Sequence, residues 1–532
     1  MVKSKIARIA AVVSAAALIA GTVAVSTAAM SDNGGIGATT KNVVDAANYS
    51  GKTPKYIFMF IGDGMSYPQI QATADYYSAL ADTNENGILE AEKVLNFTKF
   101  SVAGSATTYD STSFCPDSAS TATSLATGYK TYSGTINMDE TYTVEYETIA
   151  EKLKNQLGYK IGIVSTVNLN HATPAAYYAH QASRNSYYEI SEELIESGFD
   201  YFAGGELKQT TGANGDQTDS YTLAEQAGYK VIKTQAEAEA LTAEDGKAIV
   251  IAETIADSGS LSYNNDRDRA NGEWALSDYV EKGIEVLDND TGFFMMVEGG
   301  KIDWACHAND AGSTIADTVA LSSAVGEAIE FYNEHPDETL IIVTGDHETG
   351  GLTIGYAGTD YDTFLTNLKN QKISYAKYDS DYVAKYKEEN TPFEDVMKDI
   401  TRLFGLTAPA GTDEYTAQMD SADLHPDSNN TGTLEMTEYE YDKLKKAYET
   451  TMTRTGDEEI GQEEYLLYGS YEPLSVTITH ILNNKSGINF ASYAHTGLPV
   501  AVFAEGVGAE LFDGYYDNTE IYDFLAELTN VE

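Results

Sequence analysis

Five short apolar runs constrain the fold of this 532-residue chain more than any other feature. An apolar run of five or six residues without polar alternation predicts a strand that is buried on both faces. Helical stretches lie between the runs, such as Thr148–Gln156 and Ile315–Tyr332. Strands that alternate with helices predict an α/β fold, with a doubly wound, mostly parallel central sheet flanked by helices. The runs are Tyr56–Ile61, Ile161–Ser165, Phe293–Val297, Leu340–Thr344 and Val500–Ala504.

Residues 1–29 have the pattern of a secretory signal peptide. Lys3, Lys5 and Arg8 precede the apolar run Ile9–Val25, and small residues follow it. The alternative is a retained membrane anchor, but the run is rich in alanine and glycine and no basic stop follows it. We therefore expect export to the medium, the periplasm or the cell envelope, with no membrane span after processing. Residues 30–50 are expected to be a flexible start of the mature chain.

The apolar strand pattern stops between about Gly358 and Tyr471. Acidic, tyrosine-rich helix and turn sequence replaces it. Because this segment is far longer than an ordinary connection, it predicts an inserted lobe with a fold of its own. The expected core is then residues 51–357 together with 472–532.

Charge and cysteine content exclude some classes of function. The chain has 33 Lys and Arg against 82 Asp and Glu, a net charge of −49, so its long-range field repels nucleic acid and anionic membranes. Only Cys115 and Cys306 are present, and a chain of this size does not depend on one disulfide. Two buried free thiols, a disulfide and a direct metal role all remain open.

Charged residues follow three of the predicted strands directly: Asp63, Glu298 and the pair Asp346-His347. Each alone is consistent with a helix cap or a turn. Ligands of open α/β sheets bind at the carboxyl ends of the strands, where these three positions would meet. Together they predict a ligand site at that edge.

Two helix patterns add candidate chemistry. Ser118 would begin a helix that stops at Gly128, where unpaired N–H groups favour an anion, although an N-cap serine is the simpler explanation. Asp303 and His307 are four residues apart, a spacing that suits one zinc ion and also an ordinary surface pair. His495, followed by Thr496-Gly497, precedes the last predicted strand.

These segments, in their order along the chain, resemble the alkaline phosphatases. The matching motifs are Ile61–Ser66, Asp117–Ala119, Val297–Gly300, Gly345–Gly351 and His495–Gly497. The resemblance runs from about residue 55 to 515. It implies a site with two zinc ions and one magnesium ion, Ser118 as the nucleophile and Arg184 as a phosphate clamp. It assigns Asp303, His307 and His495 to the first zinc, Asp346, His347 and Asp63 to the second, and Asp63, Glu298 and Thr173 to magnesium.

Two further positions follow from the same resemblance. His171 and Trp304 stand where other members have different residues, and this combination resembles the marine, Vibrio-like branch. Both are expected to contact substrate, and as neighbours of metal ligands they affect magnesium affinity and phosphate release. The resemblance also implies a homodimer.

A calcium site is a separate possibility. The segment Asp427–Glu438 fits the 12-residue EF-hand loop, with glycine at position six and glutamate at twelve, although threonine replaces the usual acid or amide at position five. Its alternative is a polar turn before a helix that starts near Glu438. A second loop, Asp82–Gly87, begins the same pattern, but Lys93 occupies its twelfth position. The candidate calcium ligands are Asp427, Asn429, Thr431, Thr433 and Glu438.

The function expected from the sequence is a secreted, metal-dependent phosphomonoesterase. It would hydrolyse phosphate monoesters through a phosphoserine at Ser118 and release inorganic phosphate. A phosphodiesterase or sulfatase of the same superfamily is one alternative. An inactive calcium-binding surface protein is another.

Overall fold

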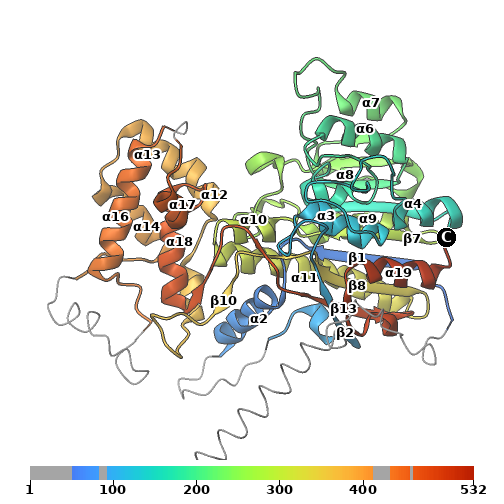
Figure 1. Cartoon of the computed structure of the whole chain (residues 1–532). Helices are drawn as coiled ribbons and strands as arrows, with labels where there is room; N and C mark the ends of the chain where they lie inside the picture. The colour runs from blue at the N-terminus through green and yellow to red at the C-terminus, as the bar shows by residue number, and fades with distance from the viewer. Residues whose placement is uncertain (1–50, 83–92, 411–431, 456–458) are drawn as a thin grey trace, which may run out of the picture. The chain divides into compact units, whose positions relative to one another are not determined.

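The computed structural model has a central ten-stranded sheet, in the order β14-β2-β13-β8-β1-β7-β3-β4-β6-β5 (Figure 1). It describes residues 51–82, 93–410, 432–455 and 459–532. Strand β13 pairs antiparallel with β8 and β2, and every other neighbouring pair in this sheet is parallel. The mostly parallel α/β fold is confirmed. The strands are β1 (Tyr56–Gly62), β2 (Val102–Thr107), β3 (Lys160–Asn168), β4 (Tyr201–Gly205), β5 (Lys230–Ile232), β6 (Ala248–Ile251), β7 (Phe293–Glu298), β8 (Thr339–Gly345), β13 (Val500–Gly506) and β14 (Gly514–Asp517).

The five predicted strands are all present, as β1, β3, β7, β8 and β13. Three of them, β1, β7 and β8, are buried along their whole length, as expected for central parallel strands. In β13, Phe503 is only half-buried. The predicted helix Ile315–Tyr332 is the longer α11 (Ala311–Glu334), whereas Thr148–Gln156 is one α-helical turn, α4 (Ile149–Lys152), that continues as a π-helical turn, η2 (Leu153–Leu157).

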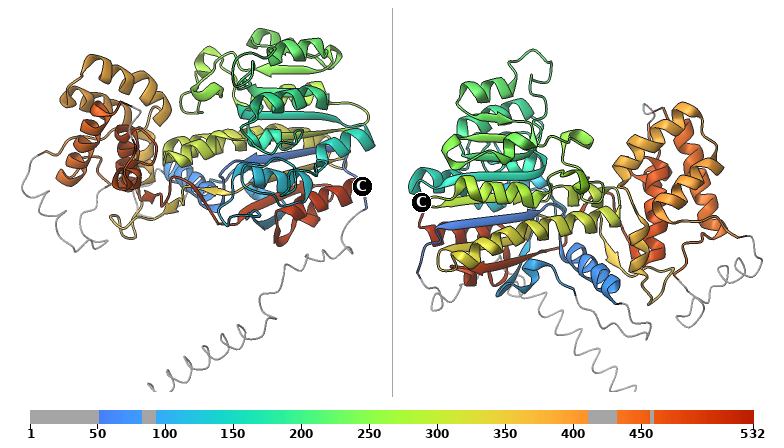
Figure 2. Two further views of the ribbon diagram at one scale, coloured as in Figure 1. Left: turned by 45° about the horizontal axis from the view of Figure 1, so that its top comes forward. Right: turned by 180° about the vertical axis from the view of Figure 1, so that it is seen from behind.

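Helices cover both faces of the sheet because alternate strand residues point to opposite sides. On one face, Phe58 of β1 contacts Phe331 of α11, with ring centroids 5.7 Å apart. Helices α9 (Leu276–Leu287) and α11 pack against each other there and lie in front of β1 in the right-hand view of Figure 2. On the other face, Tyr177 stacks on Phe294 of β7 at 5.9 Å. Helices α3 (Ser118–Thr127), α5 (Ala172–Ala175) and α19 (Thr519–Thr529) lie on that side.

A group of helices, called here the helical lobe, follows the small strand β10 (Thr353–Ile354) and is orange in Figure 1. Helix α14 shows how it folds: its buried residues Phe393, Val396, Met397 and Ile400 recur at helical spacing and form one apolar face. The described residues between 358 and 471 hold no strand of the main sheet. The lobe consists of η6 (Leu365–Asn370), α12 (Tyr375–Tyr378), η7 (Asp379–Val383), α13 (Ala384–Glu389), α14 (Phe393–Phe404), α16 (Glu438–Thr453), α17 (Gln462–Tyr468) and α18 (Pro473–Ser486).

Lobe and core belong to one compact unit, Asp45–Glu532, so the boundaries drawn at 358 and 471 stay predictions. The predicted signal peptide, the segment 30–50, most of the loop Asp82–Gly87 and the calcium candidates Asp427, Asn429 and Thr431 lie outside the described residues. Helix α16 begins at Glu438, as predicted. Across the part of the chain that the structure describes, none of the helices combines the length and apolarity needed to span a bilayer.

Both cysteines are free thiols, so the disulfide alternative is wrong. Cys306 is buried, with Sγ 3.5 Å from Thr314 Oγ1, and burial raises its pKa well above the ordinary value. Cys115 is exposed, which corrects the alternative of two buried thiols. It lies three residues before Ser118, in the loop that precedes α3.

Candidate active site

Three adjacent parallel strands bring the predicted carboxylates to one edge of the sheet. Strand β1 lies between β7 and β8, with Ile61 level with Glu298 and Gly62 level with Gly345. Asp63 follows β1, Glu298 ends β7, and Asp346 follows β8. Because the three strands run in the same direction, their carboxyl ends place these side chains together. The strands therefore bring together the side chains that were predicted from the sequence to lie at this edge.

Asp63, Asp346 and His347 form one compact group of potential metal ligands. One ligand atom from each lies within 4.8 Å of the others, and all three residues are buried. His347 Nε2 is 3.4 Å from Asp63 Oδ1 and 3.3 Å from Asp346 Oδ2. The same nitrogen is 3.3 Å from Ser118 Oγ. The group predicted for the second zinc thus converges beside the predicted nucleophile.

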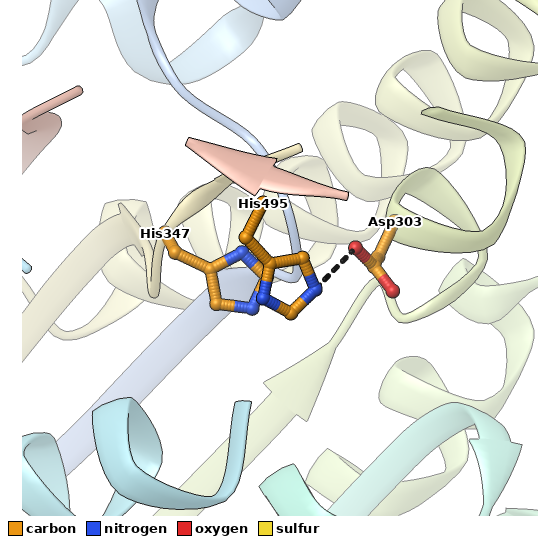
Figure 3. Close-up of side chains that lie close together, drawn as sticks. All are labelled: Asp303, His347 and His495. Carbon is orange, nitrogen blue, oxygen red and sulfur yellow. Dashed lines mark ion pairs between the residues drawn. The ribbon is translucent and has the colours of Figure 1, made fainter. Parts of the chain in front are cut away.

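A second group forms around Asp303. Ligand atoms of Asp303, His347 and His495 lie within 4.8 Å of one another, and Figure 3 shows the ion pair between His495 and Asp303. The rings of His347 and His495 stack at 3.7 Å. His307, which the resemblance assigned here, has its Nε2 3.1 Å from His495 Nε2 and 3.4 Å from Asp303 Oδ2. All three predicted ligands of the first zinc are therefore in contact.

Backbone carbonyls orient the two imidazoles of this second group. His307 Nδ1 lies 2.6 Å from Tyr493 O, and His495 Nδ1 lies 2.5 Å from Pro116 O. Because a carbonyl oxygen only accepts a hydrogen bond, Nδ1 carries a hydrogen in both rings, and Nε2 is the nitrogen left to bind a metal. The two Nε2 atoms lie 3.1 Å apart and face the same space. Histidines that bind a metal through one nitrogen commonly donate from the other to a backbone carbonyl, so this arrangement fits a metal ion.

Two short segments hold the histidines in place. Strand β12 (His495–Thr496) pairs antiparallel with β9 (Glu348–Thr349), so that His495 is level with Thr349. Asn309 has a left-handed backbone, with φ of 51°, and its Nδ2 donates to Cys306 O at 2.9 Å and to Ser492 O at 2.8 Å. It thereby joins the end of α10 (Lys301–His307) to the segment before β12. No sequence pattern indicated this pairing.

The third predicted group consists of Asp63, Glu298 and Thr173. Thr173 Oγ1 donates to Asp63 Oδ2 at 3.3 Å, and Ser165 Oγ donates to Glu298 Oε2 in a short hydrogen bond. Asp63 Oδ1 and Glu298 Oε1 are buried and have no hydrogen-bond partner among the described residues. Buried carboxylate oxygens without donors are costly unless a cation supplies the missing partner. Ser165 was not predicted to take part.

Electrostatics agree with a site built for cations. Asp63, Glu298 and Asp346 are each no more than 1% exposed. Burial raises the pKa of all three carboxyls, and the negative charge of Asp303 raises it further. Burial also lowers the pKa of His347 well below its ordinary value. Clustered carboxylates and neutral imidazoles are the oxygen and nitrogen ligands that divalent metals use in proteins, so the residues present fit metal ions.

Ser118 is the first residue of α3, and Asp117 is its N-cap. Asp117 Oδ1 accepts hydrogen bonds from Ser120 N and Gly134 N, and its Oδ2 accepts from Arg184 Nη1 at 2.8 Å. Although burial opposes ionisation, the Arg184 charge and these donors hold the pKa of Asp117 below its ordinary value. Asp117 therefore keeps the guanidinium beside Ser118, a role that the sequence did not reveal.

Ser118, Arg184, His171 and Trp304 line one cleft of about 440 Å³, together with Asp303, His307 and His495. His171 Nε2 lies 3.4 Å from Arg184 Nη2, and its ring lies 6.0 Å from that of Trp304. Burial and the charge of Arg184 lower the pKa of His171, so this imidazole is neutral. Residues of the cleft that sequence reasoning missed are Lys208, Asp257, Ser258, Tyr375 and Tyr471.

Comparisons with known proteins agree with this geometry. The sequence profile of the family "Alkaline phosphatase" matches residues 54–531. Alkaline phosphatase 4 of Bacillus subtilis is 30% identical over 472 residues, which cover 87% of this chain and 86% of that protein. The crystal structure of a cold-active alkaline phosphatase from Shewanella sp. is 26% identical, with a TM-score of 0.69, covering 89% of this chain and 99% of that one.

A Thermus thermophilus alkaline phosphatase structure has a TM-score of 0.70 over 93% of this chain and 95% of that chain. At 21% identity this likeness supports the fold alone. The profile match covers most of the chain, and the curated relative is similar over most of both lengths. The chain belongs to the alkaline phosphatase family and is a phosphomonoesterase.

Proposed function

We propose that this enzyme hydrolyses phosphate monoesters through a covalent phosphoserine at Ser118, with two zinc ions and one magnesium ion bound. The observation that supports this most is the position of Ser118 Oγ, at the start of α3 and 3.3 Å from His347 Nε2. A hydroxyl at a helix N-terminus lies where partial positive charge favours an alkoxide and a phosphate.

The resemblance divides the residues among the ions, and the contacts are compatible with that division. Asp303, His307 and His495 would hold the first zinc, and Asp63, Asp346 and His347 the second, although His347 also lies close to Asp303 and His495. Asp63, Glu298 and Thr173 would hold magnesium, the group that contains two unpartnered buried oxygens. When bound, such ions lower the pKa of a nearby hydroxyl and neutralise charge on phosphate oxygens.

The chain's own groups carry out two displacements at phosphorus. Ser118 Oγ loses its proton and attacks phosphorus, the ester P–O bond breaks, and the leaving oxygen takes up one proton, so that the leaving group departs as an alcohol. Water then loses a proton and attacks the phosphoserine, the bond between phosphorus and Ser118 Oγ breaks, and Ser118 Oγ takes up one proton as inorganic phosphate is released. Arg184, fixed by Asp117, offers its remaining N–H groups to nonbridging oxygens in a two-pronged geometry that lysine lacks.

The test combines metal analysis with three substrates. Purified enzyme should contain zinc and magnesium and should hydrolyse a monoester far faster than a diester or a sulfate ester. Ser118→Ala should lower monoester turnover by about a thousandfold or more, and acid quenching should trap phosphate on wild-type Ser118 only. Ser124→Ala is the matched control on α3, because Ser124 Oγ bonds only within the helix, to Ser120 O. Near-normal turnover by Ser118→Ala would contradict the proposal.

Export and assembly complete the proposal. The leader pattern of residues 1–29 supports secretion or an envelope location, which N-terminal sequencing of the mature protein tests. The resemblance supports a homodimer, which light scattering tests.

Calcium binding by the Asp427 loop, of which Thr433 and Glu438 are described, is tested by calorimetric titration in a Glu438→Gln variant.

A further inference from the structure

The cleft that contains Ser118 also contains three aromatic side chains: Trp304, Tyr375 and Tyr471. They come from distant segments, since Trp304 belongs to α10 while Tyr375 begins α12 and Tyr471 follows α17 in the helical lobe. All three are half-buried, whereas aromatic residues that only fill the core, such as Phe58 and Tyr177, are completely buried. All three therefore keep some accessible surface, and all three line the cleft.

Tyr375 is held at both its backbone and its ring. Its N–H donates to Asp310 Oδ2 at 2.9 Å, and its hydroxyl accepts a hydrogen bond from the Tyr263 hydroxyl at 3.3 Å. Its ring meets that of Tyr471 edge to face, with centroids 5.8 Å apart and an interplanar angle of 83°. Tyr375 thus has little freedom left to lose when a ligand binds.

Tyr471 is fixed from the lobe side. Its carbonyl oxygen accepts from Arg454 Nη1 at 2.7 Å, and Arg454 also pairs with Glu464 of α17. Its ring lies 6.3 Å from that of Tyr493, the residue whose carbonyl orients His307. Burial, and then the negative charge of Asp303, raises the pKa of Tyr471, so its phenol stays neutral.

Trp304 is fixed by a buried cation. The Lys301 ammonium lies 4.7 Å from the indole centroid and 3.7 Å from that of Tyr263. It is anchored by Asp257 Oδ1 at 2.6 Å and Ser260 Oγ at 2.9 Å, and Lys301 is completely buried. Lys301 therefore acts as a positioning residue that keeps the indole beside Asp303 and His171.

We propose that Trp304, Tyr375 and Tyr471 form a subsite for the leaving group, the aromatic subsite, and that this subsite selects phosphate monoesters whose ester oxygen is carried by a planar aromatic ring. The inference rests on the proposed function, because the ring must enter the cleft with its phosphate at Ser118. Rings that are already fixed stack or meet edge to face with a planar ligand, and such contacts add binding beyond the burial of apolar area. A saturated ring of similar size gains the burial without the aromatic contact.

Nonhydrolysable phosphonates test this inference without the difference in leaving-group chemistry between aryl and alkyl esters. The inhibition constants of phenylphosphonate, cyclohexylphosphonate and inorganic phosphate are measured on enzyme loaded with zinc and magnesium. Wild type should bind phenylphosphonate about two- to tenfold more tightly than cyclohexylphosphonate. Tyr471→Leu should bring this ratio close to one while the constant for inorganic phosphate stays within about twofold. Tyr471→Phe keeps the ring and should keep the ratio.

Tyr439→Leu is the matched control, because Tyr439 lies in the same lobe and is 77% exposed. It should leave the ratio unchanged. A ratio near one in wild type, or a ratio that survives both Tyr471→Leu and Tyr375→Leu, overturns the aromatic subsite. Equal weakening of all three inhibitors by Tyr471→Leu also overturns it, since that result shows a merely structural role. If wild type hydrolyses no monoester, the proposed function fails, whereas the phosphonate ratio is still measured by calorimetry.

Discussion

The two parts of the cleft are built in different ways. The metal-ligand part stands on the ends of β1, β7 and β8, where strand direction alone brings Asp63, Glu298 and Asp346 together. The aromatic part depends on Tyr375, which a hydrogen bond to Asp310 attaches to the core, and on Tyr471, which Arg454 holds within the lobe. Under the two proposals above, the chemistry belongs to the most constrained element of the fold, and selectivity belongs to a lobe that can change separately.

Because the two parts are built differently, substitutions in them should affect different properties of the enzyme. At the metal-ligand part, four buried acidic side chains face one another with Arg184 as a nearby cation, so ions and charge decide function there. At the aromatic part, neutral rings contribute small contact energies, and the hydrogen bonds behind them decide their position. Changes at the first part should therefore cost activity, and changes at the second should cost selectivity or stability.

Removing the metal ions should have the largest effect. Chelation should lower monoester turnover by about a thousandfold, because metals contribute several kcal/mol of charge stabilisation, and it should also lower the melting temperature, because the buried carboxylates then lack a counter-charge. Turnover, calorimetry and metal content measured on the same samples check this. Zinc together with magnesium should restore both properties. Full activity in protein shown to contain no metal would contradict the assignment of the ligands.

The metal-ligand part was largely predictable from sequence, whereas Trp304 was the one residue of the aromatic part that the sequence resemblance singled out. Buried strands leave an apolar signature, so Asp63, Glu298 and Asp346 could be placed at their ends, and Ser118 could be placed at a helix start. The position of His495 depends on the two-residue strand β12, which is too short to give a pattern. Its neighbours Thr349 and Glu348 had no predicted role, although Thr349 Oγ1 donates to Asp303 Oδ1 at 2.6 Å.

The two tyrosines of the lobe could not be predicted as cleft residues from the sequence. The chain contains 38 tyrosines, so nothing local distinguishes Tyr375 or Tyr471 from the others. What brings Tyr375 to the cleft is a hydrogen bond to Asp310, 65 residues earlier in the chain. Contacts of this kind depend on three-dimensional packing, which neither periodicity nor spacing reports. The same holds for Asp117, which reads as an N-cap but also orients Arg184.

Arg184→Lys should have the next largest effect. Lysine keeps the charge but loses the planar fork, so kcat/KM for a monoester should fall roughly 10- to 100-fold, equivalent to a charge-assisted hydrogen bond of about 1.5–3 kcal/mol. Steady-state kinetics with an aryl and an alkyl phosphate should show the same loss for both. Arg402→Lys is the control, because Arg402 binds Asp399 on the lobe surface and is about half exposed. A loss confined to one substrate would instead assign Arg184 to leaving-group selection.

Asp310→Ala should weaken the attachment of the lobe to the core. Asp310 is completely buried, caps α11 through Ser313 N, and accepts from Gln371 Nε2 at 2.6 Å and Tyr375 N at 2.9 Å. Its removal leaves several buried donors without partners, which should lower the free energy of unfolding by about 2–4 kcal/mol. Denaturant unfolding measures this. Asp337→Ala, at an exposed ion pair with Lys52, should change stability by less than about 0.5 kcal/mol. Equal effects of the two substitutions would show that Asp310 does not anchor the lobe.

The smallest expected effect is a pH dependence of the attachment at α18. His480 Nε2 lies 3.0 Å from Asn309 Oδ1, and burial, with the charge of Lys443, lowers the pKa of His480 to about 3. Because the folded pKa lies below that of the unfolded chain, near 6.5, the unfolded state binds the proton first, and stability is lost as the pH falls below about 6.5.

Between pH 7 and pH 5 this one group should cost about 2 kcal/mol of unfolding free energy. His480→Gln keeps a donor for Asn309 and cannot be protonated, so its stability should change less over the same interval by that amount. Urea unfolding of both proteins at the two pH values gives the difference. Hydrogen exchange should show the loss of protection at pH 5 in α18, the helix that carries His480, and His480→Gln should reduce that loss. An identical pH dependence in wild type and His480→Gln would show that this histidine does not couple protonation to the lobe.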